Sequence, residues 1–116
     1  MIQSVFGLLG GICPHLEGVA HMKRTAYRLF GHDYVWSVLG AGRNQKPIAA
    51  QSLVMGGNGR VGLEESLWDG RGQLAKPNAD QVKRVHTLIE GLSLEVATPD
   101  DAREILNLKG RNNVNF

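Results

Sequence analysis

Short apolar segments that end in glycine or acidic residues alternate with longer amphipathic segments along this 116-residue chain. The three apolar segments cover residues 4–9, 34–39 and 60–63. Short apolar runs bounded by turn residues are typical of buried strands in a parallel sheet. The order strand, helix, strand, helix, strand, helix therefore predicts a parallel α/β architecture.

Two helices are predicted between the strands by hydrophobic spacing and by their end residues. Apolar residues three and four apart predict a helix that opens at Pro14 and ends at Phe30, with Gly31 at its C-terminal cap. A second helix is predicted over residues 45–55, where Pro47 is tolerated in the first turn.

Two further helices are predicted after the third strand. Residues 66–77 are polar and contain glycine, which predicts a loop, and Asn78 is expected to cap the helix that follows. The residues expected on the buried stripe of this helix are Val82, Val85, Ile89 and Leu92. Thr98, followed by a proline and two acids, predicts the start of a fourth helix that reaches residue 108. The tail, residues 110–116, is expected to be disordered.

Composition and charge exclude several classes of protein. The chain is 42% hydrophobic and 21% charged, which is ordinary for a soluble globular domain. A net charge of +2 without a basic run argues against binding to nucleic acid or to an anionic membrane. No apolar run approaches the roughly 18 residues of a membrane helix, and the first residues do not resemble a signal peptide. A single cysteine, Cys13, fits a reducing compartment, so a cytoplasmic protein is expected.

The segment Asn58–Leu67 brings opposite charges to the end of the third predicted strand. Arg60 and Glu64 are four residues apart, so they share a face of an extended segment. Neighbouring residues point to opposite faces, so Glu64 and Glu65 are expected to face different surroundings. A carboxylate here can bind a metal or accept a proton, and a solvated strand end is the alternative that these residues leave open.

Ligand sites in parallel α/β folds lie at the carboxyl ends of the strands. Gly40, Gly42 and Arg43 follow the second predicted strand and could offer backbone donors and a cation to phosphate groups. A tight turn with a solvated arginine explains the same residues equally well. Trp68 is expected to be a packing residue rather than part of a substrate mouth, and Cys13 is expected to be a small buried thiol.

The sequence GGNGRVGLEESLW, with WSVLGAGRNQ before it and GQLAKPNADQV after it, resembles the C-terminal part of the β-keto acid cleavage enzymes. The type member of this family is the 3-keto-5-aminohexanoate cleavage enzyme of lysine fermentation. The resemblance runs from about Val5 to Leu108 and is most specific in RVGLE. It implies a TIM barrel, of which residues 1–109 would be the last three β/α units and a C-terminal helix. The chain then corresponds to the last third of a longer protein.

The resemblance also implies roles for the charged residues. Glu64 matches a carboxylate ligand of a catalytic divalent metal, usually zinc, which two histidines of an His-x-His motif complete; this chain has no such motif. Arg60 matches an active-site arginine that stabilises negative charge on an enolate or oxyanion. Glu65 stands where the family usually has an aspartate as general base, and its extra methylene shifts the carboxylate by about 1.5 Å. The residues implied to bind the phosphates of CoA are Gly40, Gly42 and Arg43.

The implied reaction joins a β-keto acid to acetyl-CoA and releases acetoacetate and a new acyl-CoA by retro-Claisen cleavage. In it a metal polarises the keto group and a base forms the enolate. Since the chain offers at most one metal ligand, we expect it to be inactive alone. The intact protein is expected to be a homo-oligomer. A small phosphate- or nucleotide-binding α/β module and a truncated, non-catalytic piece are the alternatives.

Overall fold

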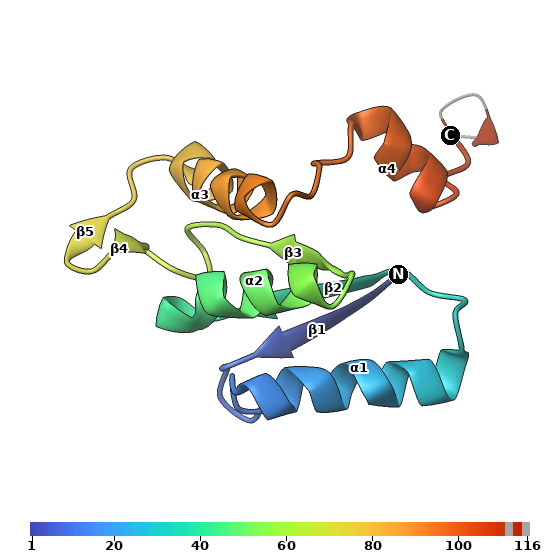
Figure 1. The fold of residues 1–116 in the computed structure, drawn as a ribbon, viewed down its shortest axis with the longest axis horizontal. Coiled ribbons are helices and arrows are strands. Elements are labelled where there is room, and N and C mark those ends of the chain that lie inside the picture. Colours follow the sequence, from blue (N-terminus) through green and yellow to red (C-terminus); the bar gives the residue numbers. More distant parts are fainter. Residues whose placement is uncertain (111–112, 115–116) are drawn as a thin grey trace.

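A three-stranded parallel sheet forms the centre of the computed structural model, which describes residues 1–110 and 113–114 (Figure 1). Strands β1 (Ile2–Phe6), β2 (Trp36–Gly40) and β3 (Asn58–Arg60) lie in that order, each parallel to the next. The predicted parallel α/β class is therefore confirmed.

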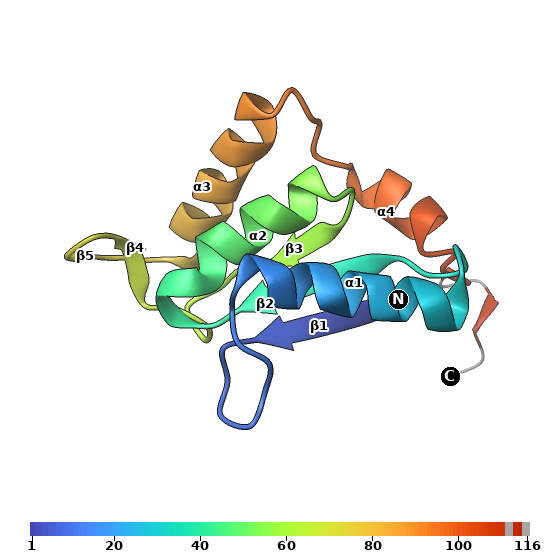
Figure 2. The same cartoon turned by 60° about the horizontal axis from the view of Figure 1, so that its bottom comes forward.

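Helices α1 (Leu16–Phe30) and α2 (Gln45–Val54) connect these strands, and a short 3-10 turn (Gly42–Asn44) precedes α2. The two helices pack against each other and against one face of the sheet (Figure 2). The buried residues that join this face to the helices are Phe6, Val19, Trp36, Val38 and Ile48. Apolar burial between helices and sheet is the main favourable term in holding these elements together.

Among the described residues, α1 and α2 make the main helix contacts with the sheet, and the other face carries no comparable helix. Phe6 and Val38 point toward the helices, so alternation along each strand turns Val5 and Leu39 toward the opposite face. Arg60 is the register partner of Leu39 on β3 and points the same way. The guanidinium therefore stands on the uncovered face, at the carboxyl end of its strand.

The third strand is shorter and lies earlier than predicted. It covers Asn58–Arg60 rather than residues 60–63, and the chain turns at residues 63–65. The main-chain amide of Ser66 donates to the carbonyl of Gly62 at 3.2 Å, which closes this turn. The expectation that Arg60 and Glu64 share a strand face is therefore wrong, because a turn separates them.

The predicted loop over residues 66–77 contains a small antiparallel hairpin, made of β4 (Trp68–Gly70) and β5 (Gln73–Leu74). Helix α3 (Asn78–Gly91) follows, with Pro77 rather than Asn78 at its cap position. The Asn78 side chain instead accepts a hydrogen bond from the main-chain amide of Leu63 at 2.7 Å. The side chain predicted to cap this helix is thus used to hold the turn after β3.

The predicted buried stripe of α3 is only partly correct. Val85 and Ile89 are half-buried, whereas Val82 and Leu92 are exposed, and the one buried residue of the helix is Gln81. The apolar stripe of α3 faces a groove of about 350 Å³ beside β3. The stripe therefore lines a groove instead of filling a core.

The last helix, α4 (Pro99–Ile105), begins as predicted. Thr98 donates through its main-chain amide to an Asp101 carboxylate oxygen at 2.8 Å, and the Asp101 amide donates back to the Thr98 hydroxyl. The Thr98 hydroxyl also donates to the Asp101 carboxylate at 2.7 Å, and this hydrogen bond, followed by the one from the Thr98 amide, lowers the pKa of the Asp101 carboxyl. The helix ends at Ile105 instead of residue 108.

Two expectations concern residues at the margins of the fold. Cys13 is exposed rather than buried. It follows Ile12, where the loop after β1 returns to Phe6 after extending away from the sheet (Figure 2). The expectation of a disordered tail falls partly on residues 111–112 and 115–116, which lie outside the described residues.

The isolated chain is expected to self-associate. Within the described residues, the outer edges of β1 and β3 pair with no strand, and unpaired edges are templates for pairing with another chain. Large apolar side chains are also exposed, among them Val5, Leu9, Val54, Val82 and Leu92. Size-exclusion chromatography with light scattering should show mass that rises with concentration. A monodisperse monomer with a cooperative thermal transition would contradict this prediction.

Candidate functional site

Arg60 joins the two carboxylates that follow β3. One guanidinium nitrogen, Nη2, lies 2.7 Å from Oε2 of Glu64 and 2.8 Å from Oε1 of Glu65. The Glu64 side chain is 82% exposed, whereas that of Glu65 is 6% exposed. The prediction that the two carboxylates face different surroundings is confirmed. One carboxylate is open to a ligand, and the other is enclosed within the protein.

Glu65 lies close to the main chain of its own turn. A Cβ added to Gly62 would stand 2.9 Å from Oε2 of Glu65, so the carboxylate occupies space that only glycine leaves free. Arg60 lies against the other oxygen of the same carboxylate. These neighbours surround an anionic group at the strand end, where a ligand of the parallel sheet would bind.

The residues after β2 meet this turn but do not all face a cavity. The main-chain amide of Gly42 donates to the carbonyl of Glu65 at 2.7 Å, so this donor is already used within the protein. A Cβ at Gly40 would stand 2.8 Å from Cβ of Ile48, which shows that Gly40 allows α2 to pack closely on the sheet. Of the three predicted phosphate ligands, Arg43 is the one whose side chain lines the cleft and contacts no acidic group among the described residues.

A cleft of about 440 Å³ lies between the start of α2 and the β4–β5 hairpin. Gly42 and Arg43 line it on the α2 side, and Trp68 and Arg71 line it on the hairpin side. The Trp68 side chain is exposed here, so the tryptophan borders the cleft rather than the core. The sequence expectation of a packing residue at this position is wrong, because the hairpin carries Trp68 away from the sheet.

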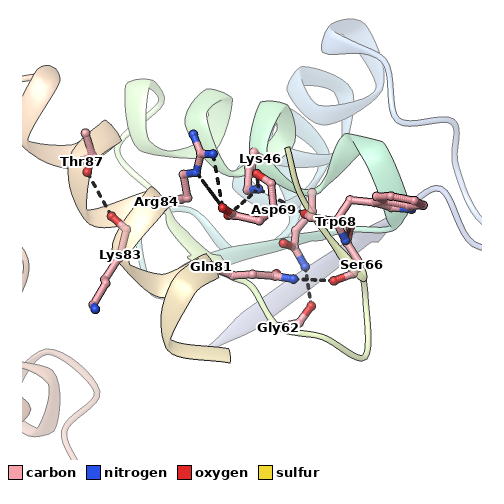
Figure 3. Close-up of polar contacts among 10 residues, drawn as sticks. Lys46, Gly62, Ser66, Trp68, Asp69, Gln81, Lys83, Arg84 and Thr87 are labelled. Carbon is pink, nitrogen blue, oxygen red and sulfur yellow. Dashed lines mark hydrogen bonds and ion pairs between the residues drawn. The ribbon is translucent and has the colours of Figure 1, made fainter. Parts of the chain in front are cut away.

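Asp69 ties the hairpin to two helices (Figure 3). Its carboxylate lies 3.3 Å from Nζ of Lys46 on α2 and 3.2 Å from Nε of Arg84 on α3. The hydrogen bonds from Arg84 and then from Lys46 lower the pKa of Asp69 below its ordinary value of 3.8. The ion pairs of Asp69 therefore stabilise the fold fully when the pH is above the ordinary carboxyl pKa, and this contribution is lost as the pH falls through the lowered pKa of Asp69. Sequence reasoning missed Asp69, since its partners are 23 and 15 residues away.

The described residues contain no cluster of three or more histidine, cysteine, aspartate or glutamate side chains that could enclose a metal. Glu64 nevertheless fits a single metal ligand, because its carboxylate is exposed at the carboxyl end of a strand and only one of its oxygens contacts Arg60. A carboxylate oxygen is a suitable ligand for zinc. Any further protein ligands would have to come from outside the described residues.

Comparison with known proteins identifies the family. The model of the β-keto acid cleavage enzymes matches residues 1–108. The chain belongs to the β-keto acid cleavage enzyme family. The resemblance carried by RVGLE and its flanking segments is thereby confirmed.

No helix in the part of the chain that the structure describes has the length and apolarity to cross a membrane.

Three relatives show how much of a family member this chain covers. It is 62% identical over 115 residues to the 3,5-dioxohexanoate:acetyl-CoA acetone transferase of Paraburkholderia graminis, covering 99% of the chain and 37% of the relative. It is 50% identical over 74 residues to a 3-keto-5-aminohexanoate cleavage enzyme of Fusobacterium nucleatum, covering 64% of the chain and 27% of the relative. It is 36% identical over 107 residues to the 3-oxoadipate:acetyl-CoA acetyltransferase of Cupriavidus necator, and this match covers 92% of the chain and 37% of the relative. The chain thus matches between 27% and 37% of the length of these relatives.

Proposed function

We propose that this chain supplies the arginine and carboxylate side of the active site of an enzyme that cleaves β-keto acids with acetyl-CoA. The observation that supports this most directly is the contact of Arg60 with both Glu64 and Glu65 at the carboxyl end of β3. The uncovered face of the sheet, toward which Arg60 points, would be the interior of a TIM barrel. The three strands would then be the last three of eight.

Arg60 and Glu65 would act on the substrate. The β-keto acid has acidic hydrogens between its keto and carboxylate groups, and the Glu65 carboxylate would take one of these protons. The planar guanidinium of Arg60 would face the negative charge that then develops on oxygen. The low exposure of the Glu65 side chain, 6%, keeps most water away from this carboxylate and strengthens its electrostatic interactions.

Glu64 would hold the metal of the intact enzyme, which we expect to be zinc. When bound, a divalent metal supplies Lewis-acid polarisation of the keto oxygen. The exposure of Glu64 suits this role, because its carboxylate can meet ligands that another part of the protein contributes. Arg60 would keep the carboxylate oriented toward the uncovered face of the sheet.

The substrates follow from the family and from the cleft. The enolate carbon of the β-keto acid would attack the acetyl carbonyl, CoA would move to the keto carbon, and cleavage of a carbon–carbon bond would release acetoacetate and a new acyl-CoA. The 62% identical relative makes 3,5-dioxohexanoate the first keto acid to test. Arg43, on the cleft beside α2, would meet a phosphate of CoA, with Gly40 and Gly42 shaping the backbone around it.

The isolated chain is predicted to show no cleavage of 3,5-dioxohexanoate in the presence of acetyl-CoA, with or without added zinc. One carboxylate cannot hold a catalytic zinc against water. A chimera in which this chain replaces the matching 37% of the P. graminis relative should bind zinc and turn over both substrates. Formation of the new acyl-CoA is followed by liquid chromatography.

Two results would contradict the proposal. Turnover by the purified 116-residue chain alone would show that the site is complete without further ligands. A folded, zinc-loaded chimera without turnover would favour the alternative of a non-catalytic piece. The unchanged P. graminis enzyme, prepared in parallel, is the control for substrate quality and assay sensitivity.

A further inference from the structure

The turn that carries the two carboxylates, residues 62–66, is held at both ends by buried glutamines; we call it the carboxylate turn. Gln45 on α2 donates through Nε2 to the carbonyl of Gly62 at 2.8 Å. Gln81 on α3 donates through Nε2 to the carbonyl of Ser66 (Figure 3). Two side chains from different helices thus contact the first and the last residue of the turn.

The middle of the carboxylate turn is held in the same manner. The main-chain amide of Leu63 donates to Oδ1 of Asn78 at 2.7 Å, and the carbonyl of Glu65 accepts from the main-chain amide of Gly42 at 2.7 Å. Four main-chain groups of a five-residue turn are therefore bound from outside it. Such a turn has little freedom to change the direction of its side chains.

Burial makes the two glutamines unusual. Gln45 is 1% exposed and Gln81 is 0% exposed, whereas Gln51 is only half-buried; among the described residues, the Oε1 atom of all three has no hydrogen-bond partner. An amide buried with one end unpaired is costly, and an apolar side chain of similar volume would avoid that cost. Each of the two glutamines, unlike an apolar side chain, donates a hydrogen bond to the carboxylate turn.

We propose that Gln45 and Gln81 are positioning residues that fix the carboxylates of Glu64 and Glu65 for the cleavage reaction. The inference rests on the proposed function, since it concerns the site in which these carboxylates act. Catalytic groups must be held to within a fraction of an ångström, and displacement by about 1 Å can cost 100-fold in rate. Loss of either donor would free one end of the turn.

The test uses the chimera with this chain in place of the matching part of the P. graminis relative. Gln81→Met keeps the volume of the side chain but removes the donor, and at saturating zinc it should lower kcat by about 10- to 100-fold, with KM within about threefold of the unchanged chimera. Gln45→Met should do the same. Gln51→Met is the matched control, because Gln51 also donates to a main-chain carbonyl, that of Leu16 at 2.8 Å, far from the turn.

A second variant separates positioning from stability. In Gln81→Glu the introduced carboxyl can donate to the Ser66 carbonyl only while it is protonated, and burial raises the pKa of such a carboxyl. The kcat of Gln81→Glu should approach that of the unchanged chimera at low pH and fall toward that of Gln81→Met as the pH rises. A role in stability alone would move the melting temperature without adding this titration to the kcat profile.

The outcomes distinguish the two proposals. If the unchanged chimera is folded but inactive, the proposed function fails and the positioning role falls with it. If the chimera is active and Gln81→Met has the same kcat, only the positioning role is overturned. If Gln81→Met does not fold, the pH profile of Gln81→Glu decides, and a profile that matches the unchanged chimera would overturn the inference.

Discussion

Glu65→Gln in the chimera should lower kcat by about two to four decades, while zinc per chain stays near that of the unchanged chimera. The amide keeps the shape of the side chain and its contact with Arg60, but it cannot accept a proton from the keto acid. Because the Glu65 side chain is only 6% exposed, a water molecule has little access to this position and cannot easily take over the role of the base. Steady-state rates beside elemental analysis check this result.

Glu65→Asp is the matched control for this prediction. It keeps the charge and restores the side-chain length that the resemblance implies for the general base. We expect kcat to be unchanged or higher, with normal zinc content. A fall in kcat as large as that of Glu65→Gln would show that the longer side chain is required and that the expected shift of about 1.5 Å is no handicap.

Glu64→Gln in the chimera should remove metal and activity together. An amide oxygen carries no net charge and binds zinc far more weakly than a carboxylate, so zinc per chain should fall at least ~10-fold. Because Glu64 is the exposed partner of Arg60, its replacement should leave the melting temperature of the metal-free protein nearly unchanged. Added zinc in excess should restore part of the activity if the loss is one of affinity.

The architecture was predictable from local signals. Apolar runs and glycine stops predicted the order of the strands and the helices between them, although β1 (Ile2–Phe6) and β3 (Asn58–Arg60) both begin two residues earlier than expected. The capping sequence that begins at Thr98 was equally clear, since its hydrogen bonds join residues three apart. Such features need no knowledge of distant parts of the chain.

The carboxylate turn shows why other features were not predictable. Val61 and the residues beside it read as a continuing strand, but the chain bends there because Gln45 and Asn78, 17 and 15 residues from their partners, bind its main chain. Single contacts between distant residues leave no periodic pattern in the sequence. Gln81 is buried although the apolar residues of its helix were expected to be, because its side chain binds the carbonyl of Ser66, which is 15 residues away in the sequence.

The candidate site was partly predictable for a related reason. Arg60, Glu64 and Glu65 are close in the sequence, so their charges meet in the structure even though the strand ends earlier than expected. The expected roles of Gly40 and Gly42 as phosphate ligands required their main-chain amides to be free of hydrogen bonds within the protein. The Gly42 amide is bound to the carboxylate turn, which only the three-dimensional structure reveals.

The most direct test of the central claim, that Glu64 holds the metal and Glu65 takes the proton, is zinc content measured on the same chimera preparations that are assayed for kcat. The account predicts that Glu64→Gln contains little zinc and that Glu65→Gln contains a normal amount, although both are nearly inactive. Loss of zinc from Glu65→Gln with retention in Glu64→Gln would reverse the two roles. Normal zinc and normal kcat in both variants would show that neither carboxylate has a part in metal binding or catalysis.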